Sequence, residues 1–317
     1  NDVGDATLFW MLANDKVRKP TDWSRTSAFL TPAAVEHLRL QCGKLHDSLP
    51  TSHHPECADA ILAIYTEGRV AGSGVPAWSG TQNLDTIEPA YAWGVQLMAG
   101  YTPGEIAKFG EEVIRLNLAR PLHATQKIGS KSYGASIRIY EPMKNLISEL
   151  QGAGFEVWIS SASAQPVVEV FARRVGIAAD HVIGGRASLD SAKRQTAAFE
   201  GCGIHPSGNQ SLINYRQGKR CWINKVIFGE KNPEKMMNQP SPTVFAAGDS
   251  DTDIFFLRDA QALRLAINRS KPELMCHAYE NRDGKWIVNP MFTEPKSRKT
   301  EGHDCSRFGI APQKDGN

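Results

Sequence analysis

The first part of the chain carries apolar residues at the spacing of one helix face. Such a face is formed by Val3, Ala6, Phe9, Trp10, Leu12 and Ala13. Proline after a capping residue marks two more helix starts, at Thr31-Pro32 and at Thr102-Pro103, and Glu105 completes a capping box at the second. Further helices are predicted over 58–67 and 84–99. We therefore predict a mainly helical region over residues 1–130.

After residue 130 the pattern changes to short apolar runs that alternate with amphipathic helices. The predicted strands are Phe155 to Ser160, His181 to Gly184, Thr243 to Ala247, Leu263 to Ile267 and Trp286 to Val288. The predicted helices are 139–150, 166–174, one that begins near Trp222 and one that ends at Asp259. Such alternation predicts a parallel sheet with helices on both faces. The expected fold class is therefore α/β, with a doubly wound, Rossmann-like core over 131–317, a polar excursion near 187–220, and an inserted helical cap over 1–130.

Three carboxylates follow the predicted strand that ends at Ala247. Gly248 breaks the strand, and Asp249, Asp251 and Asp253 come directly after it. The carboxyl end of a parallel strand is where open α/β sheets bind ligands, and carboxylate oxygens are ligands that Mg²⁺ prefers. Asp249 and Asp253 are therefore candidate metal ligands, and a solvated acidic turn is the alternative.

A hydroxyl side chain and a lysine are further candidates. Ser161 follows the predicted strand 155–160 at a helix start, where hydroxyl and backbone N–H groups can hold a phosphate. An ordinary helix cap is the alternative for this serine. Lys225 lies among apolar residues of the helix that precedes the acidic loop, where it could neutralise a bound anion. The alternative is a surface lysine that extends its ammonium into water.

Composition and charge narrow the choice of partner. The chain has 317 residues, of which 41% are hydrophobic, and this length suggests about two domains. Its 36 basic and 34 acidic residues give a net charge of +2, without a long run of one sign. No apolar run approaches the roughly 18–20 residues that span a bilayer. We therefore predict no nucleic-acid partner and no membrane partner.

The six cysteines form three sequence-near pairs, Cys42 with Cys57, Cys202 with Cys221 and Cys276 with Cys305. Each pair brackets a polar stretch of the kind that a disulfide links, and none has the C-x-x-C spacing of a zinc or redox site. Six cysteines allow many connectivities, so other pairings and unpaired buried thiols are alternatives. The pattern favours an exported protein, periplasmic or secreted.

The order of these features resembles that of the haloacid-dehalogenase-like (HAD) phosphatases. Ser161 matches the second motif of that superfamily, Lys225 the third, and Gly248-Asp249-Ser250-Asp251-Thr252-Asp253 the fourth. A closer resemblance, to the exported phosphorylcholine phosphatases of bacteria, is carried by Tyr91-Ala92-Trp93, by Gly100-Tyr101-Thr102 with Glu105, and by Glu156 to Ala162. The phosphoserine phosphatases are the nearest neighbours of that group. The resemblance is weak across 187–220 and beyond Phe292.

The first motif of the superfamily is absent from the sequence. It is Asp-x-Asp-x-Thr at the end of a first core strand, whereas Asp2 to Thr7 has the spacing Asp-x-x-Asp-x-Thr and no strand before it. In relatives, an acidic helix start like residues 1–7 follows the motif closely. We therefore expect the chain to be a fragment that begins just after its first motif. A true start with the nucleophile lost is the alternative.

The resemblance implies a role for each candidate near the phosphate. Mg²⁺ would be held by Asp249 and by the missing aspartate, with Asp253 as a further ligand or an orienting group. Lys225 would neutralise charge on the phosphate, and Ser161 would donate a hydrogen bond to a phosphoryl oxygen. The missing aspartate would attack phosphorus and form an aspartyl phosphate.

Recognition of the leaving group would come from the cap. A quaternary ammonium asks for aromatic faces and a carboxylate, and the available set is Trp78, Tyr91 and Trp93 with Asp5. Asp5 resembles by position the acidic residue that meets the substrate's amine in relatives. The alternative is that the aromatic residues pack a core and Asp5 caps a helix.

Three hypotheses for function follow. The first is a Mg²⁺-dependent phosphomonoesterase that hydrolyses a small phosphorylated amine such as phosphorylcholine. The second is a phosphoserine phosphatase or a phosphatase of broad specificity. The third is a non-catalytic protein with a degenerate HAD fold that binds a small cation or phosphate. The expected partner is a small-molecule phosphate monoester, and the fragment is expected to be inactive without the nucleophile segment.

Overall fold

The computed structural model describes residues 3–43, 48–79, 87–208 and 214–295. The chain divides into two compact units, unit 1 over 1–214 and unit 2 over 215–317. Both contain helices and short sheets, parallel and antiparallel in unit 1 and parallel in unit 2, so the fold class is mixed α/β. The α/β class is therefore confirmed, and the doubly wound core stays a prediction. The units divide after residue 214, so the helices of the predicted cap share unit 1 with the strands up to β6.

Helices make up the first part of unit 1. They are α1 (Val3–Ala13), α2 (Pro32–Cys42), α3 (Pro55–Leu62), α4 (Pro89–Gln96) and α5 (Pro103–Ala119), and a π-helical turn, Ala63–Glu67, extends α3. The Thr31 hydroxyl caps α2 by accepting a hydrogen bond from the Ala34 N–H, and Thr102 and Glu105 form the predicted capping box of α5. The two helix starts predicted from proline are confirmed, because a cap is a local interaction within a few residues.

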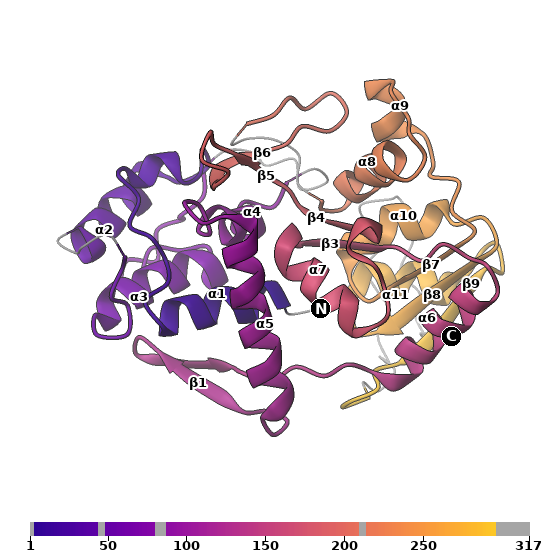
Figure 1. Cartoon of the computed structure of the whole chain (residues 1–317), viewed down its shortest axis with the longest axis horizontal. Coiled ribbons are helices and arrows are strands. Elements are labelled where there is room, and N and C mark those ends of the chain that lie inside the picture. The colour runs from indigo at the N-terminus through magenta and orange to yellow at the C-terminus, as the bar shows by residue number, and fades with distance from the viewer. Residues whose placement is uncertain (1–2, 44–47, 80–86, 209–213, 296–317) are drawn as a thin grey trace. The chain divides into compact units, whose positions relative to one another are not determined.

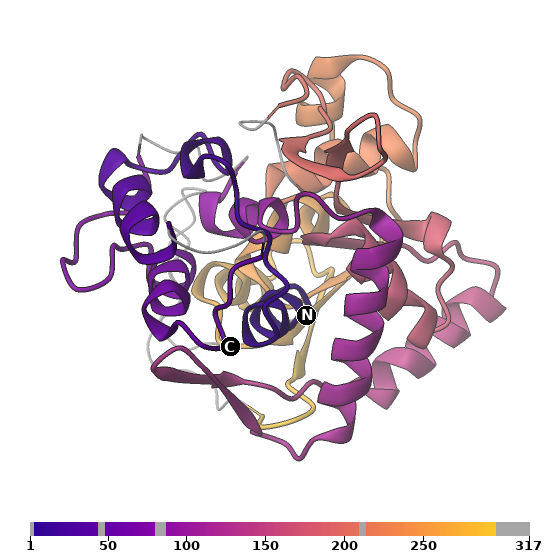
Figure 2. The ribbon, with the colours of Figure 1, turned by 60° about the vertical axis from the view of Figure 1, so that its left-hand side comes forward.

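Two-stranded sheets complete the described part of unit 1. β1 (Thr125–Ile128) and β2 (Lys131–Gly134) form an antiparallel hairpin beside α1, as Figure 2 shows, and β5 (Ala187–Leu189) and β6 (Gln195–Phe199) form another. β3 (Ile159–Ala164) and β4 (Val182–Gly185) pair in parallel and are connected through α7 (Gln165–Arg174). The amphipathic helix α6 (Glu141–Gly152) precedes them.

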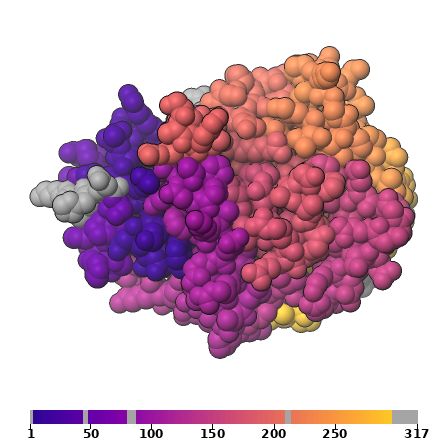
Figure 3. Space-filling view, in the orientation of Figure 1, coloured from indigo at the N-terminus to yellow at the C-terminus, as the bar shows by residue number. Residues whose placement is uncertain are grey.

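Helices α5 and α7 pack closely against each other. Gly110 of α5 lies so near α7 that an added Cβ would stand 3.4 Å from the Cα of Val167. Their outer surfaces lie side by side on the face of unit 1 that Figure 3 shows.

The strand before α7 begins later than predicted. β3 starts at Ile159, where it pairs with Val182, whereas the predicted strand began at Phe155, which is 45% exposed. Residues 155–158 are not part of a strand, because the partner strand β4 begins only at Val182. Apolar content alone therefore placed the strand too early, since pairing decides where a strand starts.

Unit 2 is built on a parallel sheet of β7 (Phe245–Gly248), β8 (Leu263–Asn268) and β9 (Trp286–Pro290), in that order. Figure 1 shows α10 (Ile254–Asp259) and α11 (Pro272–Glu280) against these strands. Its core includes Leu257, Leu274, Met275 and Trp286. The three predicted strands are confirmed. The helix before them, α8 (Gln217–Val226), starts at Gln217 and not near Trp222, and α9 (Pro233–Asn238) follows it.

Disulfides are present in the described residues. Cys42 and Cys57 form one, which confirms that predicted pair. Cys202, Cys221 and Cys276 are also disulfide-bonded, and Cys305 lies outside the described residues. Disulfides persist in oxidising compartments, so they fit an extracellular protein. None of the helices in the described ranges combines the length and the apolar character needed to span a bilayer.

The buried imidazole of His277 makes the stability of unit 2 depend on pH. His277 lies in α11 and is 5% exposed. Burial, together with the positive charges of Arg258, Arg282 and Arg216, lowers its pKa to about 4. The unfolded chain binds the same proton near pH 6.5, so acid favours the unfolded state.

We therefore predict a loss of stability as the pH falls from about 6.5 to about 4. The contribution of His277 is fully present above pH 6.5, and up to about 3 kcal/mol of it is lost at the acid end. Urea unfolding of the wild type and of His277→Gln, measured at several pH values, checks this. The variant should show a flatter profile over this interval, and two parallel profiles would contradict the prediction.

Candidate functional site

The acidic loop of unit 2 begins where β7 ends, at Gly248. Ser250 caps a 3-10 turn, Asp251–Asp253, and Asp253 completes the capping box. The loop folds back so tightly that a Cβ on Gly248 would meet the Asp253 side chain at 2.7 Å. A glycine is therefore required at position 248 for close packing of the strand end against this carboxylate.

The carboxylate of Asp253 holds the loop together from inside. It is 5% exposed, and its Oδ1 accepts a hydrogen bond from the Nζ of Lys219 at 2.6 Å. Its Oδ2 accepts from the backbone N–H groups of Asp249 and Ser250, at 3.0 and 3.2 Å. Both oxygens thus have partners in the protein, so the geometry favours the orienting role for Asp253 over direct metal ligation.

The lysine at the acidic loop is Lys219, which the sequence analysis did not single out. It is 5% exposed and lies in the first turn of α8. Lys225, the predicted residue, places its ammonium 4.5 Å from the ring centroid of Trp222. The two lysines lie on different sides of the helix, because six residues turn an α-helix by about 240° modulo a full turn. The late start predicted for α8 is why Lys219 was missed.

The other two carboxylates of the loop have different partners. Asp249 Oδ2 lies 3.0 Å from Nη1 of Arg269, and the Asp249 side chain is 33% exposed. Asp251 Oδ1 accepts a hydrogen bond from the Leu274 N–H at 2.8 Å, so it caps the first turn of α11. Asp249 is therefore the loop carboxylate with access to solvent and a cationic partner.

Asp249 is the residue of the acidic loop that could bind a metal ion. Within the described ranges, no group of three or more His, Cys, Asp or Glu side chains is placed to hold a metal ion. Asp249 supplies one hard carboxylate oxygen donor, of the kind Mg²⁺ prefers, and a guanidinium already stands against it. The donor chemistry fits Mg²⁺ at this position, with further ligands to come from outside this loop.

Ser161 lies in unit 1, inside β3 and not after it as predicted. It is 4% exposed, and its hydroxyl accepts a hydrogen bond from the Ser163 N–H at 3.3 Å. It is not the cap of α7, because the capping position is Ala164, which makes no side-chain cap bond. The helix-cap alternative for Ser161 is therefore excluded, and its role towards phosphate stays a prediction.

A buried amide links β3 and β4 beside Ser161. Asn214 is fully buried and donates through Nδ2 to the carbonyl oxygens of Ser161 and Ile183, both at 2.7 Å. Its Oδ1 accepts from the Ser160 hydroxyl at 3.1 Å. Sequence reasoning missed this residue, since nothing local marks an asparagine that bonds to strands so far back in the chain.

The predicted aromatic set is only partly brought together. Trp93 is fully buried, donates from Nε1 to the Thr26 hydroxyl at 2.9 Å, and meets Trp78 edge-on at 5.6 Å between ring centroids. Tyr91 is 46% exposed and lies on the opposite side of α4. Trp93 is thus a core residue whose faces are covered, so Trp78, Tyr91 and Trp93 do not form a cage.

Asp5 has an aromatic partner that the sequence did not indicate. The hydroxyl of Tyr65, in the π-helical turn, donates to Asp5 Oδ1 at 2.5 Å. The Tyr65 ring meets Phe9 edge-on at 6.4 Å, and Gly94 lets it approach α4, where a Cβ would stand 2.9 Å from the ring. π-Helical turns occur often at functional sites. Asp5, Tyr65 and Phe9 therefore form a carboxylate-and-ring cluster in unit 1.

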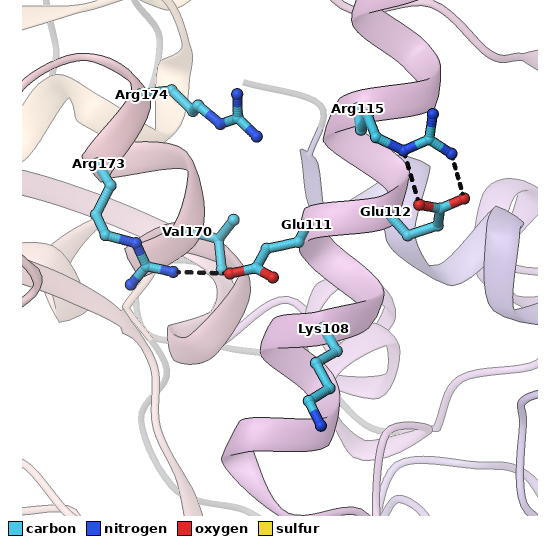
Figure 4. A pocket seen from close by; sticks show the side chains of 7 residues that line it. All are labelled: Lys108, Glu111, Glu112, Arg115, Val170, Arg173 and Arg174. Atoms are coloured by element: carbon cyan, nitrogen blue, oxygen red, sulfur yellow. Dashed lines mark hydrogen bonds and ion pairs between the residues drawn. The ribbon is translucent and has the colours of Figure 1, made fainter.

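A surface hollow of about 450 Å³ lies between α5 and α7. Figure 4 shows that charged side chains line it, with Glu111 paired to Arg173 and Glu112 paired to Arg115. None of the candidate residues lines this hollow. Its ion pairs are exposed and contribute little to stability.

Comparison with known proteins shows a likeness in fold. No family model matches the chain, and neither does any curated protein. A conserved, functionally unknown protein from Anaerococcus prevotii DSM 20548 has a similar structure, with a TM-score of 0.63 at 20% identity over 92% of this chain and 81% of that one. A protein of unknown function from Bordetella pertussis Tohama I aligns at 18% identity over 83% of this chain and 94% of that one, with a lower TM-score of 0.46. The first likeness shows a shared fold and bears on no activity.

The buried Lys219–Asp253 pair gives a test of which lysine supports the loop. Lys219→Met leaves the Asp253 charge buried without its partner, so we expect a loss of about 3 kcal/mol in the free energy of unfolding. Lys225→Met is the matched control, and we expect it to cost less than about 1 kcal/mol, because this lysine is half-buried on an aromatic face. Chemical denaturation of both variants makes the comparison. Similar losses in the two would contradict the assignment.

Proposed function

We propose that the chain is part of a Mg²⁺-dependent phosphomonoesterase of the HAD type, acting on a small phosphorylated amine such as phosphorylcholine. The observation that carries the proposal is the buried Lys219–Asp253 pair, which fixes an acidic loop at the carboxyl end of β7 with Asp249 in it. The motif order of the resemblance, a lysine followed by Gly-Asp-x-x-x-Asp, is kept when Lys219 takes the place of Lys225.

The chemistry of phosphate monoesters explains why such residues are needed. A phosphate dianion repels an attacking carboxylate, so its charge must be balanced before reaction. Mg²⁺ supplies most of that balance when it is bound, and Asp249 is the residue of the loop that would hold it. Lys219 is fixed in position by Asp253 and brings a further positive charge to the loop. Asp253 orients Asp249, because its Oδ2 accepts a hydrogen bond from the Asp249 backbone N–H.

The proposal requires a nucleophile from outside these residues. The resemblance assigns it to Asp-x-Asp-x-Thr, which the sequence does not contain. Ser161 keeps its proposed role as a hydrogen-bond donor to a phosphoryl oxygen. Its hydroxyl can donate while it accepts from Ser163, because a hydroxyl is both donor and acceptor.

The leaving group is assigned to unit 1 on the basis of the Asp5 cluster. Asp5 provides a negative charge, and Tyr65 and Phe9 provide rings beside it. A carboxylate with aromatic neighbours attracts an organic ammonium through charge and through the ring quadrupole. The disulfides agree with a phosphatase that acts outside the cytoplasm, so we propose a periplasmic or secreted location.

The activity test is phosphate release by the chain extended to its natural N-terminus. Phosphorylcholine and O-phosphoserine are compared with and without Mg²⁺, and the 317 residues alone serve as the control. We expect metal-dependent turnover in the extended chain only, faster on phosphorylcholine. Asp249→Asn should reduce kcat by at least about 100-fold, because it removes a charged metal ligand. Asp180→Asn, at a strongly exposed aspartate, is the matched control and should leave kcat unchanged.

The outcomes separate the hypotheses. Preference for O-phosphoserine keeps the chemistry and changes the substrate. Absence of turnover in an extended chain that contains Asp-x-Asp-x-Thr would remove the proposed reaction. If the upstream segment lacks that motif, binding of phosphate or an organic cation without turnover becomes the supported function.

The Asp5 cluster predicts a specific loss of substrate affinity. Asp5→Asn keeps the hydrogen bond from Tyr65 and removes the charge, so KM for phosphorylcholine should rise about tenfold. KM for an uncharged-alcohol ester such as p-nitrophenyl phosphate should not change. Tyr91→Ala is the matched control, since this exposed ring lies on the other side of α4, and should leave both KM values unchanged. Equal effects of Asp5→Asn on the two esters would contradict the assignment.

A further inference from the structure

A guanidinium stands against the carboxylate that is assigned to the metal. Nη1 of Arg269 lies 3.0 Å from Oδ2 of Asp249, and the two side chains are 30% and 33% exposed. The two residues follow neighbouring parallel strands, because Gly248 at the end of β7 is in register with Ala266 of β8. Both residues therefore lie at the carboxyl end of the sheet.

The turn that carries Arg269 is fixed by several contacts. The Arg269 N–H donates to the Ile267 carbonyl at 2.9 Å, and the Ser270 N–H donates to Oδ1 of Asn268 at 2.9 Å. Asn268 is buried and bonds through Nδ2 to the Tyr279 hydroxyl at 3.1 Å. Ser270 has a φ of 57°, a conformation that is unfavourable for a residue with a Cβ. The surroundings thus hold a strained turn in place directly after Arg269.

The ion pair has two consequences for a metal ion at Asp249. Since both partners are one-third exposed, the pair is weak enough for a divalent cation to displace the guanidinium from the oxygen. The displaced positive charge remains near, because the turn fixes the backbone of Arg269, and it repels the divalent cation bound at Asp249. The two effects together give a site that accepts Mg²⁺ with reduced affinity.

We propose that Arg269 is a built-in competitor of the divalent cation at Asp249 and sets its affinity. The inference rests on the proposed function, which assigns Asp249 to the metal. It adds a residue that lies outside the motifs of the resemblance. Arg269 touches neither the substrate nor the reacting atoms in this role, so it is a positioning residue.

The test is a Mn²⁺ titration of the chain extended to its natural N-terminus, with the free ion measured by electron paramagnetic resonance. Arg269→Gln should lower the Kd for Mn²⁺ roughly tenfold, because it removes a positive charge that contacts the ligand. Arg269→Lys keeps the charge and should stay within about threefold of the wild type. Lys271→Gln removes a charge two residues away and is the matched control for net charge, with no expected change. Asp249→Asn should abolish the binding that Arg269→Gln strengthens.

The outcomes distinguish the inference from the function on which it rests. Binding that Asp249→Asn removes but that Arg269→Gln leaves unchanged or weakens would overturn the inference alone. Saturable binding that survives Asp249→Asn, or no saturable binding in any variant, would overturn the metal assignment and the inference with it. Melting temperatures of all variants show whether they fold, and Arg269→Lys provides the comparison if Arg269→Gln does not.

Discussion

The buried ion pair of Lys219 and Asp253 is the interaction on which the arrangement of unit 2 depends. Two opposite charges removed from water lose their hydration, and only close contact and further hydrogen bonds balance that loss. Asp253 meets both conditions, because one oxygen contacts the ammonium and the other accepts two backbone N–H groups. The tight turn after Gly248 follows from this, as does the placement of Asp249 at the strand end. The position of α8 is coupled to the loop through the same lysine.

Paired charges of this kind recur along the carboxyl end of the unit 2 sheet. Arg216 is 2% exposed and forms two hydrogen bonds to Glu273 at 3.0 and 3.2 Å, while it also donates to the Asp251 carbonyl at 3.0 Å. Removing one partner of such a pair is costly, which fixes the geometry of the whole edge. The pair of Asp249 and Arg269 differs, because both side chains have access to solvent. Asp249 is therefore the carboxylate that can most easily exchange its cationic partner for another cation, while the buried pairs at this end of the sheet stay fixed.

The sequence predicts those features that depend on neighbouring residues. The caps at Thr31 and Thr102 are local, so the starts of α2 and α5 were predicted correctly. The start of α8 was misplaced, because the polar segment before Trp222 gains its stability from Lys219 and its distant partner. The same holds for Asp5, whose contact with Tyr65 joins segments that no pattern connects. Residue types at the site were thus predictable in part, and the pairs that they form were not.

The aromatic residues show how burial decides between packing and recognition. A ring binds a cation only through a face that the cation can reach, and the faces of Trp93 are covered by the core. Its indole N–H has a partner in Thr26, so the residue is also satisfied as a buried polar group. Asp5 is half-buried and lies beside a ring that is itself held by a hydroxyl contact, which keeps charge and aromatic surface together. The proposed amine recognition in unit 1 therefore starts from Asp5, whose carboxylate is held beside the Tyr65 ring by the hydroxyl of that residue.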